Sequence, residues 1–155
     1  MKKKAIIISV KGLKLSSKEK KIFKNNRPWG IILFKRNIKT IKQTQSLVTD
    51  IRKLSKDKKL PVLIDEEGAS VTRLNNLFNH KFSQKKIGDI YKINSKLCLN
   101  IYKSYINDVV SVLKKIGVNI NTVPVLDVLR KSTSKVIGNR SFSEDPKLVQ
   151  KLGKY

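Results

Sequence analysis

Residues 60–68 read Leu-Pro-Val-Leu-Ile-Asp-Glu-Glu-Gly, a run of apolar side chains that ends abruptly in three carboxylates. A short, continuous apolar run is typical of a strand buried on both faces, as in a parallel sheet. Pro61 is compatible with this strand because it stands near the strand's start. In parallel α/β proteins the functional residues follow the carboxyl ends of the strands. The stretch therefore predicts a buried strand and a candidate site that begins at Asp65.

Apolar runs of strand length alternate with amphipathic segments on both sides of this stretch. Ser16 with Glu19, and Thr40 with Gln43, have the spacing of a capping box, which marks the start of a helix. Three further strands are predicted, at residues 5–10, 31–34 and 118–123. Helices are predicted at residues 16–25, 40–54 and 94–116. Another is predicted from Lys147 onward, with Asp145-Pro146 as its cap and first turn.

Strands that are apolar throughout and separated by helices indicate an α/β fold with a parallel sheet covered by helices. No repeat, linker or low-complexity block divides the 155 residues, a length typical of one domain. The pattern fits either a (β/α) barrel or a doubly wound sheet, and periodicity does not decide between them.

The chain carries a formal net charge of +24, from 35 Lys and Arg against 11 Asp and Glu. Such a charge raises the question of nucleic-acid binding. However, 29 of the basic residues are Lys, and most stand singly or in pairs, while aromatic residues are only 6%. Base readout relies on Arg, and single-strand binding relies on aromatic platforms beside basic grooves. We interpret the charge as a Lys-rich surface and expect no nucleic-acid partner.

Composition also indicates the compartment. No stretch approaches the roughly 18 apolar residues of a membrane-spanning helix, so we expect no membrane association. The single cysteine, Cys98, rules out an internal disulfide framework and is typical of a reducing compartment. We therefore expect a globular, cytoplasmic protein in which Cys98 is a packed thiol.

The acidic cluster Asp65-Glu66-Glu67 stands out in so basic a chain. Adjacent carboxylates at a strand end can bind Mg²⁺ or Ca²⁺, act as acid and base, or accept hydrogen bonds from sugar hydroxyls. They can equally be structural, with one carboxylate capping the next element and another paired with Arg73. A His-based metal site is not expected, because His80 is the only histidine.

Four blocks resemble a known family when read in order: GIILFKRNI at 30–38, PVLIDEEGASVTR at 61–73, PVLDV at 124–128 and VIGNRSFSEDP at 136–146. Together they resemble the N-terminal part of glycoside hydrolase family 3, specifically the bacterial β-N-acetylhexosaminidases (β-N-acetylglucosaminidases) of peptidoglycan recycling. The resemblance covers nearly the whole chain. It implies a TIM-type (β/α)8 barrel of which residues 1–155 supply about the first four β/α units.

The resemblance further implies hydrolysis, with retention, of terminal β-linked N-acetylglucosamine from muropeptides of the cell wall. Neither a metal nor an organic cofactor is implied. Asp65 matches the family's sugar-binding Asp, and Arg73 and Arg140 match two substrate-binding arginines. The family's loop differs here at two positions, where Ala69 replaces a glycine and Ser70 an arginine.

No catalytic residue is assigned within the chain, because the family's nucleophile and its acid/base histidine belong to later motifs. His80 does not match that histidine and is expected to be a loop or core residue. A complete barrel of this type has about 250 residues. We therefore expect an incomplete barrel that is inactive alone and that pairs with a missing C-terminal half or is poorly soluble. The alternatives are a noncatalytic carbohydrate-binding remnant and, less favoured, a basic nucleic-acid-binding protein.

Overall fold

We describe the protein from a computed structural model, which covers residues 2–68, 70–78 and 80–155. The chain divides into two compact units. The first unit consists of Met1–Asp65, Arg73–Asn79 and Ser111–Asn121. The second consists of Glu66–Thr72, His80–Val110 and Thr122–Tyr155. Each unit has its own buried core.

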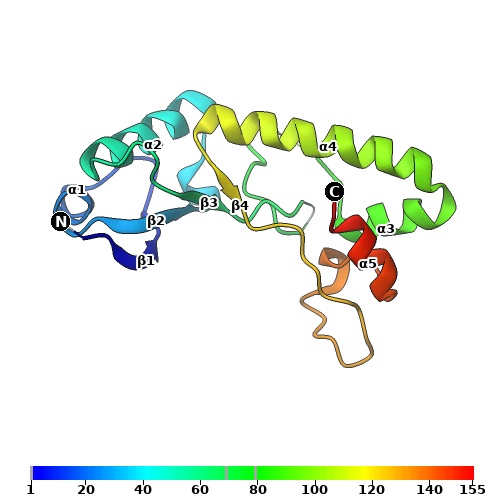
Figure 1. Cartoon of the computed structure of the whole chain (residues 1–155). Coiled ribbons are helices and arrows are strands. Elements are labelled where there is room, and N and C mark those ends of the chain that lie inside the picture. The colour runs from blue at the N-terminus through cyan, green and yellow to red at the C-terminus, as the bar shows by residue number, and fades with distance from the viewer. Residues whose placement is uncertain (1, 69, 79) are drawn as a thin grey trace. The chain divides into compact units, whose positions relative to one another are not determined.

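The first unit is built on a parallel sheet of four strands (Figure 1). The strands are β1 (Lys4–Ile8), β2 (Pro28–Leu33), β3 (Val62–Ile64) and β4 (Ile120–Asn121). They are hydrogen-bonded in the order β1-β2-β3-β4, and every pair is parallel. Each strand therefore lies beside the strand that precedes it in the chain. A doubly wound sheet reverses its strand order near the middle, so this order favours the barrel arrangement.

Helices cover one face of this sheet. They are α1 (Ser17–Asn26) and α2 (Ile41–Leu54), and Figure 1 shows α2 running along the sheet. Leu47, Val48 and Ile51 are the apolar face of α2 and are buried, as are Ile31 and Val62 of the facing strands. Burying such aliphatic side chains is the main source of stability in a unit of this kind.

The capping box predicted at Ser16 is complete, whereas the one predicted at Thr40 has only its first hydrogen bond. The Ser16 hydroxyl accepts a hydrogen bond from the Glu19 backbone N–H, and the Glu19 carboxylate accepts one from the Ser16 backbone N–H, which completes the capping box of α1. The Thr40 hydroxyl accepts a hydrogen bond from the Gln43 backbone N–H at the start of α2. The side chain of Gln43 accepts its hydrogen bond from Lys39 rather than from Thr40.

An ion pair between Lys3 and Asp57 links the start of β1 to the segment after α2, with Lys3 Nζ 2.7 Å from Asp57 Oδ2. The hydrogen bond from Lys3 lowers the pKa of Asp57 despite the opposing effect of burial, and the Lys59 backbone N–H adds to the lowering. Because the folded protein binds this proton more weakly than the unfolded chain, the carboxylate stabilises the fold above its unfolded pKa of about 3.9. That stabilisation is lost as the pH falls through the lower folded pKa.

We expect Asp57→Asn to lower the free energy of unfolding of the first unit at pH 7 by at most about 1 kcal/mol, since the pair is only partly shielded from solvent. The difference from wild type should shrink as the pH is lowered below 4. Urea unfolding followed by the fluorescence of Trp29, the only tryptophan, checks this. A difference that grows with acidification would contradict the role given to Asp57.

The second unit is mainly helical. It contains α3 (Gln84–Ile93), the 3₁₀ helix η2 (Gly138–Arg140), α5 (Pro146–Leu152) and most of α4 (Ser95–Ile116), whose last residues from Ser111 belong to the first unit. A short 3₁₀ helix, η1 (Lys35–Asn37), follows β2 in the first unit. The core of the second unit is formed by residues of α3, α4 and α5 together with Phe142, which follows η2. These residues are Ile87, Cys98, Tyr102, Phe142, Leu148, Val149 and Leu152.

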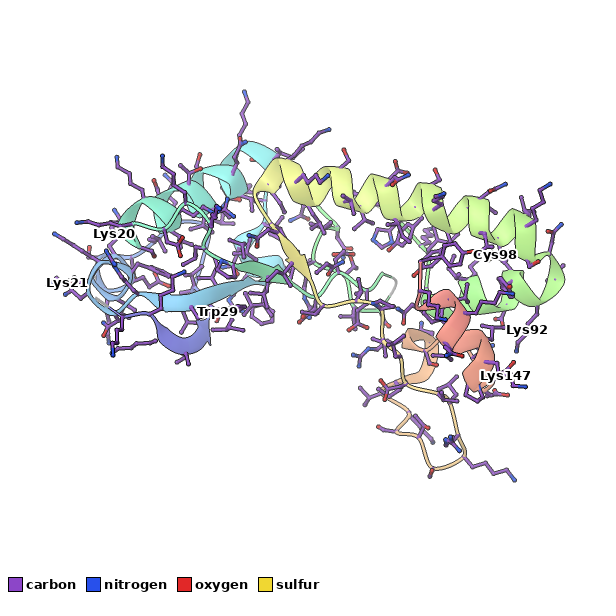
Figure 2. The ribbon with its side chains drawn as sticks, viewed as in Figure 1. Lys20, Lys21, Trp29, Lys92, Cys98 and Lys147 are labelled. Carbon is purple, nitrogen blue, oxygen red and sulfur yellow. The ribbon has the colours of Figure 1, made fainter. Side chains whose placement is uncertain are left out.

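Two close contacts define this core. Cys98 is fully buried, as predicted, and its thiol donates to the Ile87 carbonyl at 3.2 Å (Figure 2). Gly88 of α3 lies against the backbone of Phe142, whose carbonyl oxygen occupies the space that a Cβ would need. The second unit therefore depends on a glycine within a helix.

The structure confirms an α/β fold with parallel strands and the predicted helices at α1, α2, α4 and α5. Asp145 caps α5, as expected, by accepting a hydrogen bond from the Lys147 backbone N–H at 2.9 Å. All four strands differ from their predicted bounds. Those expected at 5–10, 31–34 and 60–64 are Lys4–Ile8, Pro28–Leu33 and Val62–Ile64, and the one expected over 118–123 contains only Ile120–Asn121. Helix α3 was not predicted at all.

Charged side chains cover the surface. Figure 2 shows Lys20 and Lys21 of α1, Lys92 of α3 and Lys147 of α5 extending away from their helices, and all four are exposed. Among the described residues, no helix is long and apolar enough to cross a membrane.

Candidate functional site at the strand ends

Asp65 directly follows β3, at the carboxyl end of the sheet. Its Oδ2 lies 3.7 Å from an Nη atom of Arg73, which belongs to the same unit. The two side chains keep 28% and 24% of their surface exposed, respectively. Pairing of one carboxylate of the cluster with Arg73 was the structural alternative, and Asp65 is the carboxylate that makes this pair. The carboxylate and the guanidinium are held together yet remain accessible to a ligand.

An aromatic ring connects this pair to the end of β2. The guanidinium carbon of Arg73 lies 5.6 Å from the centre of the Phe34 ring, and that of Arg36 lies 4.6 Å from the same ring. These distances are within the range of cation–π attraction. Phe34 and Arg36 follow β2, so the ends of two neighbouring strands contribute to one cluster. We call Phe34, Arg36, Asp65 and Arg73 the strand-end cluster.

Arg140 lies in the second unit, on η2, and is paired with Glu67. Its Nε donates to Glu67 Oε2 at 2.7 Å, and an Nη donates to Oε1 at 3.0 Å. This is the two-pronged geometry in which a guanidinium matches a carboxylate best. The Glu67 side chain is only 7% exposed, whereas the Arg140 side chain keeps 24% of its surface exposed.

The loop that carries Glu67 is a tight turn closed on itself. The Glu67 backbone N–H donates to the Val71 carbonyl at 3.0 Å, and Gly68 and Val71 form an isolated antiparallel bridge. Gly68 has φ of +93°, a conformation that side-chain-bearing residues rarely adopt. Ser70, which stands where the resemblance leads us to expect an arginine, donates to Asn139 Oδ1 at 2.8 Å. Ala69 lies outside the described residues.

Glu66 points to a different partner from its neighbour Glu67. Its Oε1 lies 2.9 Å from His80 Nε2, and the side chains of Glu66 and His80 are 0% and 4% exposed. The ring of Tyr105 packs edge-on against His80 with 5.1 Å between ring centres. Burial, with a further contribution from the charge of Glu66, raises the pKa of Tyr105 above its usual value. His80 thus lies outside the helices and strands with its side chain buried against Glu66, which agrees with the expected loop or core residue.

We expect His80→Ala to destabilise the second unit by about 3 kcal/mol, because Glu66 then loses a buried partner. Replacing both residues, as in Glu66→Leu with His80→Leu, should cost less, since no buried charge remains. Reaction of Cys98 with a thiol reagent across a urea series measures both. If His80→Ala loses no more stability than the double variant Glu66→Leu with His80→Leu, the role given to His80 is contradicted.

The three carboxylates of the acidic cluster therefore have three separate partners: Arg73 for Asp65, His80 for Glu66 and Arg140 for Glu67. Within the described part of the chain, no group of three or more His, Cys, Asp or Glu side chains is placed to hold a metal ion. The cluster is built for hydrogen bonding and for ion pairs with arginine.

Sequence reasoning identified Asp65, Arg73 and Arg140 but not the contributions of Glu67 and Arg36. Glu67 was recognised only as part of an acidic run. Its proximity to Arg140, 73 positions away, depends on how η2 and the Glu67 turn pack. Arg36 belongs to a polar segment after a strand, which was the available signal for it. The hydrogen bonds that fix Arg36 come from backbone and hydroxyl groups that a sequence pattern does not reveal.

Comparison with known proteins extends these observations. Residues 2–155 match the family model of the glycosyl hydrolase family 3 N-terminal domain. A protein named beta-hexosaminidase from Hydrogenovibrio crunogenus is 33% identical over 149 residues, which are 96% of this chain and 41% of that protein. A beta-hexosaminidase of Stenotrophomonas maltophilia is 28% identical and is matched over 42% of its length. The chain thus spans well under half the length of these relatives.

Solved structures agree with the fold. NagZ from Neisseria gonorrhoeae, in complex with N-trifluoroacetyl-D-glucosamine, superimposes with a TM-score of 0.87 at 27% identity, over 96% of this chain and 44% of that one. A family 3 β-N-acetylglucosaminidase from Paenibacillus gives a TM-score of 0.79 at 27% identity, over 95% of this chain and 27% of that chain. The match to the family model covers almost every residue, and the chain therefore belongs to the glycosyl hydrolase family 3 N-terminal domain family.

Proposed function

We propose that this chain forms the sugar-binding N-terminal part of a β-N-acetylhexosaminidase. The observation that carries the proposal is the Asp65–Arg73 pair, which stands accessible at the carboxyl end of β3. In a family 3 hydrolase barrel this edge of the sheet is where substrate binds. The beta-hexosaminidase names of the relatives, and the N-trifluoroacetyl-D-glucosamine bound in one structural neighbour, support an N-acetylglucosamine residue as the ligand.

The roles proposed for the three site residues are those that the family resemblance implies, and their chemistry is compatible with them. The Asp65 carboxylate accepts hydrogen bonds from hydroxyls of the terminal sugar. Arg73 and Arg140 donate hydrogen bonds to sugar oxygens or to an acidic group of the substrate through their rigid forks of N–H groups. Hydrogen bonds to charged groups contribute about 1.5–3 kcal/mol each, so each of these side chains can add measurably to the affinity for a sugar.

The reaction proposed for the complete enzyme is hydrolysis of a terminal β-linked N-acetylglucosamine with retention. A carboxylate attacks the anomeric carbon to form a glycosyl–enzyme, and an acid/base group protonates the leaving oxygen and then activates water. We assign neither role to residues 1–155. The proposed substrates are muropeptides returned to the cytoplasm during peptidoglycan recycling, and the proposed location is the cytoplasm.

Exposed apolar residues on β1 and β2 support a barrel with further units. Ile6 and Ile7 of β1 and Trp29 of β2 are large apolar residues on the surface, and Trp29 is visible there in Figure 2. We propose that the remaining β/α units of the barrel cover this apolar surface, because an uncovered strand edge favours association with another chain.

Two readouts on the purified 155-residue chain test the proposal. Isothermal titration with a 4-nitrophenyl β-N-acetylglucosaminide should give saturable binding, while release of nitrophenol should stay at the uncatalysed rate. The corresponding β-glucoside, which lacks the acetamido group, serves as the control and should bind more weakly. Absence of saturable binding would refute sugar binding by this chain. Turnover that disappears in Asp65→Ala would instead refute the division of roles.

A further inference from the structure

Arg36 is held in a fixed position at the carboxyl end of the sheet. Its Nε donates to the Val10 carbonyl at 3.1 Å, and an Nη donates to the Ser9 hydroxyl at 2.9 Å. Its guanidinium also lies over the Phe34 ring. These contacts come from the segments that follow β1 and β2, so two strand ends fix one exposed side chain.

The backbone beneath Arg36 is fixed as well. Asn37, the next residue of η1, is fully buried, and its side-chain amide donates to the carbonyls of Val10 and Gly12 at 2.9 and 3.0 Å. Its own side-chain oxygen accepts from the Phe34 backbone N–H at 2.9 Å. A ligand that binds Arg36 therefore has little side-chain or loop freedom left to restrict, which favours affinity.

The guanidinium of Arg36 has unused hydrogen-bonding capacity. Two of its five N–H groups donate to the segment that follows β1. Among the described residues, no carboxylate lies within ion-pair distance of Arg36, and Asp65 is paired with Arg73 instead. The strand-end cluster thus holds two guanidinium groups and one carboxylate around a single aromatic ring. Its net positive charge favours an anionic group.

We propose that Arg36 binds a carboxylate on the portion of the substrate beyond the terminal N-acetylglucosamine. The planar guanidinium matches a carboxylate in shape and charge, and the preset position of Arg36 resembles a binding group more than a mobile surface charge. The inference rests on the proposed sugar site, because it is the sugar that brings the rest of the substrate to this edge. It assigns to Arg36 a preference for acidic glycosides over neutral ones.

A matched pair of ligands tests this assignment. The two are non-hydrolysable thioglycosides of N-acetylglucosamine, one carrying a 4-carboxyphenyl group and the other its methyl ester. Isothermal titration of the wild-type chain at pH 7 and low salt should give about tenfold tighter binding of the acid, the change expected for one charge-assisted hydrogen bond. The preference should fall as salt is raised, because exposed charges are screened.

Variants locate the preference. The Arg36→Gln variant should bind the two ligands equally, and its affinity for the ester should stay within about twofold of wild type. The control is Lys35→Gln, which makes the same change in charge at an exposed neighbouring residue. This control should keep the tenfold preference for the acid. Arg36→Lys retains the charge without the planar fork and should keep only part of the preference. Trp29 fluorescence in a urea series shows whether each variant leaves the first unit folded.

The outcomes separate the two proposals. A wild-type chain that binds both ligands equally, or an Arg36→Gln variant that still prefers the acid, overturns the role of Arg36 and leaves the sugar site intact. A wild-type chain that binds neither ligand overturns the proposed function and the role of Arg36 together. The expected pattern, a preference present in wild type and Lys35→Gln and absent in Arg36→Gln, supports both.

Discussion

Gly88→Ala is expected to unfold much of the second unit while leaving the first unit folded. The new Cβ would overlap the carbonyl oxygen of Phe142, a backbone atom that cannot turn away as a side chain can. Overpacking a core normally lowers the free energy of unfolding by about 1–3 kcal/mol. A clash with a backbone atom should cost as much as the top of that range or more. We expect a loss of about 3 kcal/mol or more.

Two probes, one in each unit, measure this effect. Cys98 is fully buried in the second unit, and burial raises the pKa of its thiol, so it should react slowly with a thiol reagent in wild type. Gly88→Ala should make Cys98 react rapidly while the fluorescence of Trp29, in the first unit, stays unchanged. Gly12→Ala is the matched control, because its Cβ meets no atom within 4 Å. Slow reaction of Cys98 in Gly88→Ala would contradict the packing described.

Asp65→Ala is expected to weaken binding of N-acetylglucosamine by at least about 100-fold. If the carboxylate accepts two hydrogen bonds from sugar hydroxyls, losing both removes about 3 kcal/mol or more, and a 100-fold change corresponds to about 2.8 kcal/mol. The variant should stay folded, because Asp65 is partly exposed and its 3.7 Å pair with Arg73 contributes little stability.

Isothermal titration of wild type and Asp65→Ala gives the comparison. Asp50→Ala removes the same charge from an exposed position on α2 and should bind the sugar as wild type does. Equal weakening in Asp50→Ala would show that the effect comes from net charge rather than from contact with the sugar. Unchanged binding in Asp65→Ala would remove Asp65 from the site.

Local signals predicted most of the fold. The caps at Ser16, Thr40 and Asp145 act within three residues of the side chain, so their spacing is visible in the sequence. The continuous apolar runs likewise predicted the strands. The strand β3 is buried on both faces, whereas β1 leaves Ile6 and Ile7 exposed. The strand order, which separates a barrel from a doubly wound sheet, depends on long-range pairing, and periodicity carries no information about it.

Helix α3 was missed for a physical reason. It begins with a proper cap, since the Ser83 hydroxyl accepts a hydrogen bond from the Lys86 backbone N–H, but it carries Gly88 in its interior. A glycine there disfavours a helix by about 1 kcal/mol relative to alanine. The contact between Gly88 and the Phe142 backbone, which requires a residue without a side chain, cannot be seen from either segment alone.

The candidate site, like the fold, could be predicted from the sequence only where local signals determine it. The placement of Asp65 after a buried strand follows from the sequence, and Arg73 lies only eight residues further on. Which glutamate faces which partner does not follow, because adjacent side chains on a tight turn can point in either direction. The Gly68 turn decides it by directing Glu66 to His80 and Glu67 to Arg140.

The most direct test of the sugar site observes its arginines individually. The chain contains only six arginines, so their side-chain Nε–H resonances can be resolved by NMR and assigned with single Arg→Lys variants. On titration with N-acetylglucosamine, the resonances of Arg73 and Arg140 should shift saturably, while those of Arg27, Arg52 and Arg130 should remain in place. Saturating sugar that leaves both Arg73 and Arg140 unmoved would contradict the account.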